Sequence, residues 1–373
     1  MARTTVQELT EIGQSIWLDF ISRSLIDTGK LKNMIDFGIR GLTSNPSIFD
    51  KAISASNDYD IKIIKLQHEK KSTFEIYDDL TVKDIQDAAD IFRAIYDNTK
   101  GIDGYVSLEI NPKLSYQIEE TIAEGKRLFR KVDRPNVLFK VPSTEQGFKA
   151  IEELLAQGIN VNVTLIFSLQ QYMNTAQAYI KGVKRFAQNN GDINRLSSVA
   201  SVFISRADTQ IDELLDAKIN QSPDNSKKDL VALKGKAAVA NAAIIYSKYR
   251  EIFSSQQFKE IQKKGARVQR LLWGSTSTKN PVYSDIKYVA ELIGENTINT
   301  IPEKTLNAFL DHGIVKETLS TEIRHSQEVL DQLGNQGIDI NSVCKKLLDE
   351  GVAAFEKSFD SLLSAIEEKA KKL

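Results

Sequence analysis

The chain of 373 residues carries 49 lysines and arginines against 50 aspartates and glutamates, a formal net charge of -1. This balance argues against nucleic-acid binding through a basic surface, which depends on releasing counterions from phosphates. Hydrophobic residues make up 41% and charged residues 27% of the sequence, which is typical of a folded globular protein and excludes disorder throughout. Cys344 is the single cysteine and there are three histidines, so we expect neither a disulfide framework nor a metal site.

The N-terminal segment 1–10 contains Arg3 and Glu8 where a secretory signal would be apolar. No stretch approaches the roughly 18 consecutive apolar residues that a membrane-spanning helix requires. The sequence therefore predicts a cytoplasmic protein that does not associate with membranes.

Eight short apolar segments rich in β-branched residues alternate with longer segments of helical periodicity. Parallel strands that are buried on both faces and joined by crossover helices have this pattern. The expected strands are 16–20, 41–45, 105–110, 137–142, 161–167, 199–206, 268–275 and 297–302. Helical patterns between them include 114–129, 145–157, 169–189 and 283–293.

Eight alternating units predict an α/β fold, a (β/α)8 barrel of the TIM type. The runner-up, an open doubly wound sheet, would usually have a glycine-rich phosphate-binding turn, and no GxGxxG or GxxxxGK[ST] pattern occurs. The two longest connections, 50–104 and 207–267, contain helical patterns at 80–98 and 230–253, which we interpret as extra helices of the barrel.

After the last expected strand, helical patterns at 306–313, 316–333 and 341–372 predict a C-terminal helical extension. We therefore expect the chain to be one domain, with the barrel at about 14–305 and the extension at about 306–373.

Active sites of (β/α)8 barrels lie at the C-terminal ends of the strands, so polar residues at the ends of the expected strands are the candidates. In chain order they are Asp19; Thr43, Ser44 and Asn45; Ser107 and Glu109; Lys140 and Ser143; Asn162 and Thr164; Ser205 and Arg206; Ser275, Thr276 and Lys279; and Asn299 and Thr300.

Lys140 lies within an otherwise apolar strand, Val137-Leu138-Phe139-Lys140-Val141-Pro142. Burial disfavours the charged form of an amine, and a neutral lysine amine can form a Schiff base with a ketone. Glu109 and Asp19 would point to the same end of the barrel, where carboxylates can transfer protons for such a reaction. The alternative is a structural ion pair between Lys140 and one of these carboxylates, which is the commoner arrangement for a buried lysine.

Two interpretations also stay open at other positions. Asn45, before Pro46, is suited either to ligand contact or to capping a helix that begins near Ser47. Arg206 and Lys279, at junctions between strand and loop, are suited either to binding a phosphate or carboxylate or to being surface charges.

When the candidate residues are taken in the order of the expected strands, the sequence resembles the transaldolase family, most closely its longer bacterial class. The similarity covers nearly the whole chain. It is carried by Trp17-Leu18-Asp19 and by the segments 41–49 (GLTSNPSIF), 138–144 (LFKVPST), 162–168 (NVTLIFS), 201–206 (SVFISR), 265–270 (GARVQR), 273–276 (WGST), 279–281 (KNP) and 299–305 (NTIPEKT).

The resemblance implies a transferase of ketone groups that moves a dihydroxyacetone unit between sugar phosphates in the non-oxidative pentose phosphate pathway, without a metal or organic cofactor. The donor would be fructose 6-phosphate or sedoheptulose 7-phosphate, and the acceptor erythrose 4-phosphate or glyceraldehyde 3-phosphate.

By the same resemblance, Lys140 forms the Schiff base, Asp19 transfers the proton, and Glu109 and Thr164 hold the water of imine formation and hydrolysis. The substrate-binding residues would be Asn45, Thr43, Asn162, Ser205, Arg206, Ser275 and Lys279. In shorter members of the family the phosphate-binding arginine follows the sixth-strand serine after several residues, whereas here Arg206 is adjacent to Ser205. Arg267 and Arg270 are therefore further candidates for the phosphate, but they lie early in the expected seventh strand, where structural ion pairing is the favoured role.

Two other functions stay open. One is a lysine-type aldolase that releases free dihydroxyacetone, and the other is a non-catalytic barrel that binds sugar phosphates. The expected partners are sugar phosphates, with no nucleic acid and no membrane, and the chain would be a monomer or a homodimer.

Overall fold

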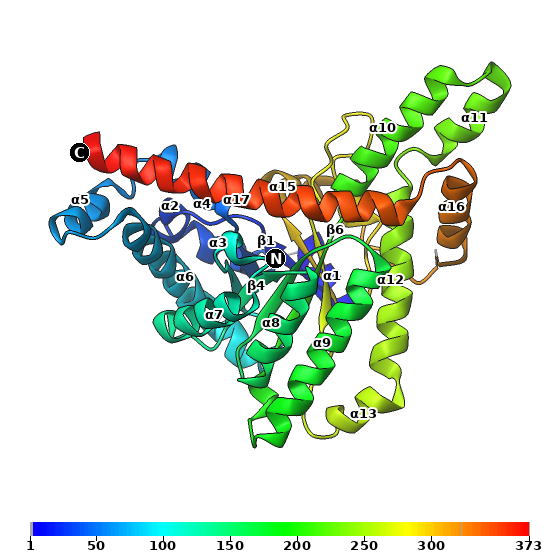
Figure 1. Ribbon diagram of the computed structural model, residues 1–373. Coiled ribbons are helices and arrows are strands. Elements are labelled where there is room, and N and C mark those ends of the chain that lie inside the picture. Colours follow the sequence, from blue (N-terminus) through cyan, green and yellow to red (C-terminus); the bar gives the residue numbers. More distant parts are fainter. Residues whose placement is uncertain (1–2, 322, 373) are drawn as a thin grey trace.

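The centre of the computed structural model, which describes residues 3–321 and 323–372, is a closed barrel of parallel strands (Figure 1). Its strands are β1 Gln14–Leu18, β2 Ile39–Thr43, β3 Tyr105–Glu109, β4 Val137–Pro142, β5 Val161–Ile166, β6 Ser198–Phe203, β7 Arg270–Gly274 and β8 Thr297–Ile301. Each strand pairs in parallel with the next, and β8 pairs with β1. The expected (β/α)8 fold is confirmed.

Alternate residues of each strand face the barrel interior, because successive side chains of a strand point to opposite faces. The interior floor is a cluster of large apolar side chains: Trp17, Tyr105, Leu138, Val199, Leu272 and Ile298. Gly41 of β2 leaves room for this cluster, since a Cβ there would lie 2.5 Å from the indole of Trp17. Asp19, Lys140 and Thr300 lie two positions after floor residues, so they share the inward face nearer the C-terminal end.

One helix precedes β1, and the others lie in the connections between the strands or follow β8 (Figure 1). They are α1 Thr5–Ile12, α2 Arg23–Asp27, α3 Lys30–Asp36, α4 Pro46–Ser54, α5 Asp60–His68, α6 Thr73–Asn98, η1 Pro112–Leu114, α7 Ile118–Val132, α8 Glu145–Ala156, α9 Leu169–Gln188, η2 Ile193–Arg195, α10 Ser205–Gln221, α11 Asp224–Leu233, α12 Ala237–Ser254, α13 Gln256–Gln262, α14 Lys287–Ala290, α15 Glu303–His312, α16 Ile323–Asn335 and α17 Ile340–Lys372. The helical character expected for 50–104 and 207–267 is confirmed by α4 to α6 and by α10 to α13.

The expected extension of the sixth strand to Arg206 is wrong. β6 ends at Phe203, and Ser205 begins α10, in which Ala207 and Ile211 are buried at helical spacing. The apolar run continues across this boundary, and no side chain caps the start of the helix. Arg206 therefore extends from the first turn of a helix and not from a strand.

Three helical expectations also need correction. The pattern 230–253 is divided between α11 and α12 by Gly235, whose φ of +69° suits glycine. In 283–293 only Lys287–Ala290 is α-helical. In 316–333 the helix begins only at Ile323, because the backbone N–H groups of Thr318 and Leu319 bond to the carbonyl of Ile293.

Four residues within the sequence-based expectations lie outside the described residues. Met1 and Ala2 belong to the N-terminal segment, Glu322 to the expected helix 316–333, and Leu373 to the end of the expected extension.

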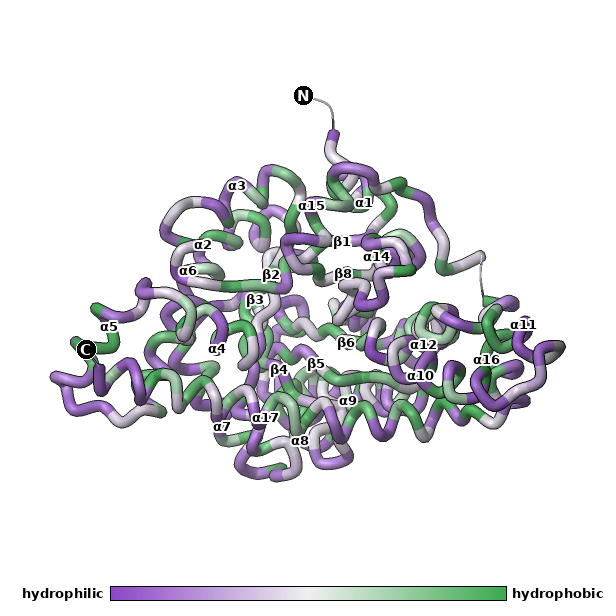
Figure 2. Tube along the Cα trace, turned by 90° about the horizontal axis from the view of Figure 1, so that it is seen from above, coloured by the Kyte–Doolittle hydropathy of each residue, from purple (hydrophilic) through white to green (hydrophobic). Residues whose placement is uncertain are grey.

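The helix α17 lies at the C-terminal end of the barrel, on the side of β4 and β5 (Figures 1 and 2). Polar and apolar residues alternate along it in Figure 2, as in an amphipathic helix. Its buried residues recur at helical spacing: Val343, Cys344, Leu347, Gly351, Val352, Phe355, Phe359, Leu362 and Ile366. The C-terminal extension expected from the sequence is therefore packed on the barrel.

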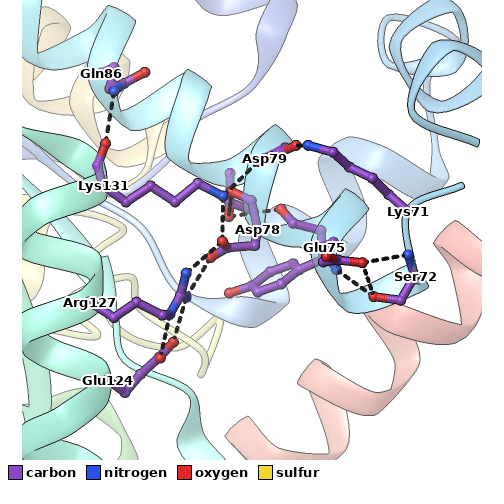
Figure 3. Close-up of polar contacts among 11 residues, drawn as sticks. Lys71, Ser72, Glu75, Asp78, Asp79, Gln86, Glu124, Arg127 and Lys131 are labelled. Atoms are coloured by element: carbon purple, nitrogen blue, oxygen red, sulfur yellow. Dashed lines mark hydrogen bonds and ion pairs between the residues drawn. The ribbon is translucent and has the colours of Figure 1, made fainter. Parts of the chain in front are cut away.

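Helices α6 and α7 are joined by a network of ionic contacts (Figure 3). Asp78 accepts two hydrogen bonds from Arg127, at 2.8 and 2.7 Å, and Lys131 bridges Asp78 and Asp79 at 2.5 and 2.6 Å. Burial alone would raise the pKa of Asp78, but its cationic partners hold the pKa below its ordinary value. Tyr77 of α6 meets Phe359 of α17 edge-on, with ring centroids 5.1 Å apart. The network thereby fixes a helix on which α17 rests.

Within the described part of the chain, no single helix is long and apolar enough to cross a membrane. The pair Lys227–Leu233 and Ala237–Ser254, bent by 53°, meets the criteria of length and composition when taken together. Many residues of its second member, α12, are buried in the protein.

Candidate active site

A cavity of about 500 Å³ opens at the C-terminal end of the barrel, within the usual size range of small-molecule sites. The sequence-predicted residues that line it are Asp19, Thr43, Asn45, Lys140, Thr164, Arg206, Ser275, Thr276, Lys279 and Thr300. The closed barrel thus brings together strand ends that are far apart in the sequence.

Lys140 extends from β4 into this cavity and is 5% exposed. Its Nζ donates a hydrogen bond to the carbonyl of Ser44 at 3.0 Å and lies 2.9 Å from Oε2 of Glu109. Burial raises the pKa of Glu109, and the charge of Lys140 offsets part of this effect. The structural ion pair considered above therefore exists, and the same amine also lines a cavity. The two interpretations of Lys140 are compatible.

Asp19 follows β1 and lines the same cavity. Its Oδ1 accepts a hydrogen bond of 2.6 Å from Oγ1 of Thr43, which lies 2.6 Å from Oγ1 of Thr300. Burial raises the pKa of Asp19, while the Thr43 hydrogen bond and the charges of Lys140 and Lys279 act in the opposite direction. A carboxyl group with a raised pKa exchanges protons more readily near neutral pH, which suits acid–base chemistry.

Thr164 of β5 lines the cavity with a hydroxyl that is buried and has no hydrogen-bond partner among the described residues. A buried polar group without a partner is costly unless water or a ligand satisfies it. The next residue, Leu165, has a φ of +59°, and the register between β5 and β6 shifts between Val163 and Ile166. This left-handed conformation is uncommon for leucine, so the strand is irregular beside the unpaired hydroxyl.

Asn45 caps a helix and also lines the cavity. Its Oδ1 accepts a hydrogen bond of 3.0 Å from the N–H of Ile48, so it caps α4, which has Pro46 in its first turn. It also lines the cavity, and within residues 3–321 and 323–372 its Nδ2 donates no hydrogen bond. The amide N–H groups therefore remain for a ligand.

Two residues expected to bind substrate do not line the cavity. Asn162 is buried, with its Nδ2 donating to Oγ of Ser107 at 3.0 Å and its Oδ1 accepting from Oγ of Ser201 at 2.6 Å. Ser205 is buried at the start of α10, and its Oγ lies 3.1 Å from that of Ser275. Since Ser201 and Ser275 do line the cavity, Asn162 and Ser205 are placed to orient them.

Arg206, Lys279 and Lys51 contribute positive charge to the cavity. The guanidinium carbon of Arg206 lies 5.6 Å from the centroid of the Phe203 ring, and no carboxylate of the described residues forms an ion pair with it. Burial holds the pKa of Arg206 below its ordinary value. Lys279 donates a hydrogen bond of 2.7 Å to Oγ of Ser277. A cavity-facing arginine without a carboxylate partner is suited to binding an anion such as phosphate.

Arg267 and Arg270, the further phosphate candidates, lie at the opposite end of the barrel. Arg270 begins β7, and its Nη1 and Nη2 lie 3.0 Å from Oδ1 of Asp103 and 2.7 Å from Oγ of Ser15. Arg267 donates to backbone carbonyls in the loop before β3. Neither side chain is placed to bind a ligand in the cavity.

The chain matches a family model described as Transaldolase/Fructose-6-phosphate aldolase over residues 16–366. The chain belongs to this family. Proteins named Transaldolase from Trichodesmium erythraeum (strain IMS101) and from Saccharopolyspora erythraea are 47% and 44% identical to it, over 100% and 98% of this chain and 99% and 97% of their own lengths. A protein named Transaldolase 2 from Nostoc sp. is 44% identical over 100% of this chain and 99% of its own length. The resemblance inferred from the strand motifs is confirmed.

The cavity of this transaldolase-family chain also contains residues that sequence reasoning missed. They are Ser47 and Lys51 of α4, Ser201 and Phe203 of β6, Ser277 after β7 and Phe355 of α17. Strand alternation from Val199 would have indicated Ser201 and Phe203. Helical spacing from Ser47 to Lys51 would have placed those two on one face. No sequence signal indicated that α17 would contribute Phe355.

Among the described residues, no group of three or more histidine, cysteine, aspartate or glutamate side chains is placed to hold a metal ion. The charged residues that line the cavity are Asp19, Lys51, Lys140, Arg206 and Lys279. One carboxylate among cations suits an anionic organic ligand better than a divalent cation, which prefers several oxygen ligands.

Proposed function

We propose that this protein is a transaldolase of the non-oxidative pentose phosphate pathway. It transfers a dihydroxyacetone unit from fructose 6-phosphate or sedoheptulose 7-phosphate to erythrose 4-phosphate or glyceraldehyde 3-phosphate. The observation that carries the proposal is the Lys140 amine, which lies 2.9 Å from the Glu109 carboxylate and shares a cavity with Asp19. Membership of the family and the full-length similarity to proteins named Transaldolase support it.

Lys140 is the nucleophile in this proposal. Its neutral amine adds to the ketone carbon of the donor, and the carbinolamine loses water to form the imine. Glu109 is close enough to exchange protons with the nitrogen, and its raised pKa favours that exchange. The unpaired hydroxyl of Thr164 supports a role in holding the water that leaves and later returns.

Asp19 is the proton-transfer group in the carbon–carbon step. It takes the proton from the hydroxyl on the carbon that leaves as an aldehyde, and the bonding electrons move into the protonated imine to give an enamine. It then returns the proton to the oxygen of the incoming aldehyde. The hydrogen bond from Thr43 orients the carboxylate for both transfers, and the free N–H groups of Asn45 support a role in binding the dihydroxyacetone hydroxyls.

Arg206 is the main phosphate-binding residue in this proposal, because it faces the cavity and forms no ion pair with a carboxylate of the described residues. Lys279 adds a second positive charge, and the hydroxyls of Ser275 and Ser277 lie on the same lining. An arginine and a lysine beside serine hydroxyls form a set of donors suited to a phosphate group.

Borohydride trapping tests the proposal. The protein is incubated with fructose 6-phosphate, reduced, and digested, and the modified peptide is mapped by mass spectrometry. We expect one adduct, on Lys140, that is absent from a Lys140→Met variant. Lys51→Met is the matched control, because Lys51 is another lysine of the same cavity, and this variant should keep the adduct. Modification of a different lysine, or no modification, contradicts the mechanism.

Turnover with and without an acceptor separates the alternatives. A transaldolase requires erythrose 4-phosphate, whereas a lysine-type aldolase releases free dihydroxyacetone at the same rate without it. A non-catalytic barrel would bind fructose 6-phosphate without turnover. The sequence would favour this alternative if Lys140, Glu109 or Asp19 were replaced, but all three residues are present.

We also propose that the barrel and the helical extension act as a single domain, because α17 contributes Phe355 to the lining of the cavity.

We further propose that the protein is located in the cytoplasm and is a monomer or a homodimer. Light scattering during gel filtration measures the oligomeric state, and an assembly larger than a dimer contradicts it.

A further inference from the structure

Phe355 is the one residue in the described part of α17 that lines the catalytic cavity. Its side chain is buried, and Nζ of Lys140 lies over its ring, 5.6 Å from the ring centroid. The expected nucleophile therefore has a carboxylate on one side, from Glu109, and an aromatic ring on another. That ring comes from the helical extension and not from a strand of the barrel.

Gly351, one helical turn before Phe355, lies where α17 packs on β5 of the barrel. A Cβ at Gly351 would lie 2.9 Å from Cδ2 of Leu165, so a larger residue would require a shift of the Leu165 side chain or of the helix. Leu165 is the residue with a φ of +59° that follows Thr164. Gly351 and Phe355 share one face of α17, because residues four apart lie above one another on a helix. The same face thus packs on the irregular part of β5 and reaches Lys140.

The turn after Phe355 also contacts other elements. Oγ of Ser358 lies 2.7 Å from Oγ of Ser47, which itself lines the cavity on α4. Phe359 packs against Tyr77 of α6, the helix held by the ionic network of Figure 3. These contacts come from different elements, so the ring of Phe355 is held over Lys140 by several independent supports.

We propose that Phe355 determines the reaction specificity of the site: it shields the Lys140 adduct from bulk water and thereby directs the enamine to the aldose acceptor. This inference rests on the proposed transaldolase function. Closing an active site against water prevents hydrolysis of reactive intermediates. The face of an aromatic ring also stabilises a nearby positive charge, here the protonated amine or imine.

The enamine on Lys140 has two fates. In transfer, its carbon forms a bond to the aldehyde carbon of the acceptor, the aldehyde oxygen takes the proton from Asp19, and hydrolysis of the new imine releases the longer ketose phosphate. In the side reaction, a proton from water adds to the enamine carbon. Water then adds to the resulting C=N bond, the C–N bond breaks as the hydroxyl proton moves to nitrogen, and free dihydroxyacetone leaves. Protonation by bulk water is the step that Phe355 limits.

The test measures free dihydroxyacetone and sedoheptulose 7-phosphate together, in reactions supplied with fructose 6-phosphate and erythrose 4-phosphate. Phe355→Ala removes the ring over Lys140, and we expect the ratio of free dihydroxyacetone to sedoheptulose 7-phosphate to rise about 30-fold, as for the loss of one desolvated cation–π contact. Phe355→Leu keeps most of the apolar volume without the ring, so a smaller rise is expected. If the alanine variant does not fold, the leucine variant decides the test.

Phe359→Leu is the matched control, because it makes the same substitution one turn later on α17, against Tyr77 and away from the cavity lining. Its product ratio should equal that of the unmodified protein even if its stability is lower, because the contact between Ser358 and Ser47 and the packing at Gly351 still hold Phe355 over Lys140. An unchanged ratio in the folded Phe355 variants, or an equal rise in Phe359→Leu, overturns the inference. Failure of the proposed function is seen separately, as the absence of a borohydride adduct on Lys140 in the unmodified protein.

Discussion

Replacing Arg270 with methionine removes the cation of a buried network, and we expect it to lower stability without weakening substrate binding. The guanidinium lies 3.0 Å from Oδ1 of Asp103 and donates to Oγ of Ser15 and to the carbonyl of Thr297, each at 2.7 Å. The Arg270 and Asp103 side chains are 11% and 7% exposed. Methionine fills much of the space but leaves the carboxylate without its cation.

The expected loss follows from the cost of an unpaired buried charge. Removing one partner of a buried ion pair lowers the free energy of unfolding by about 3–5 kcal/mol. At about 2.1 cal/mol/K per residue, a chain of 373 residues unfolds with an entropy of about 0.8 kcal/mol/K. The variant should therefore melt roughly 4–6 °C below the unmodified protein. KM for fructose 6-phosphate should not change, because Arg270 begins β7 at the end of the barrel opposite the cavity.

Thermal unfolding followed by circular dichroism and initial-rate kinetics check both parts. The double variant Arg270→Met/Asp103→Asn is the control, because it also removes the carboxylate charge that the first substitution leaves unpaired. It should lose less stability than the two single variants together. A several-fold rise in KM with an unchanged Tm would refute the reasoning, since it would place Arg270 at the substrate phosphate.

Three further predictions concern the cavity. Arg206→Met should raise KM for fructose 6-phosphate about 10- to 100-fold through loss of a charged hydrogen bond, and initial rates that show KM unchanged would exclude Arg206 as a phosphate ligand. Thr43→Val removes the hydrogen bond that lowers the pKa of Asp19, so that pKa rises. Because the proton acceptor must be ionised, the acidic limb of kcat/KM should move to higher pH, and a shift to lower pH contradicts the assignment of Asp19. Thr164→Val should lower kcat about 100-fold without lowering Tm, since the hydroxyl it removes has no partner in the described residues, and a large drop in Tm would indicate a structural role instead.

The strands and most of the polar residues that line the cavity could be predicted because they follow from local rules. A strand buried on both faces must be apolar throughout, so a lysine within Val137–Pro142 is conspicuous in the sequence alone. The two-residue period then places Lys140 above Leu138 and Asp19 above Trp17 on the inward face. Family motifs added the roles expected for these side chains.

The remainder could not be predicted because it depends on contacts distant in sequence. The apolar run continues through Ile204 without glycine or proline, and no side chain caps the start of α10, so the end of β6 before Arg206 is weakly marked in the sequence. The early position of Arg270 in the expected seventh strand favoured a structural ion pair, but the sequence did not identify Asp103 as its partner. The amphipathic pattern of α17 identifies its buried face but not the surface that this face covers, so Phe355 was missed.

The placement of α17 has a consequence for the order in which a growing chain acquires its parts. β8 completes the barrel at Ile301, whereas the residue that covers Lys140 is Phe355, well downstream. During synthesis from the N-terminus, all the strands, Lys140 and Glu109 exist before Phe355 has been added. The nascent chain can therefore assemble the amine proposed as the nucleophile before Phe355 can cover it, and a chain cut between β8 and α17 would leave that amine without the aromatic ring.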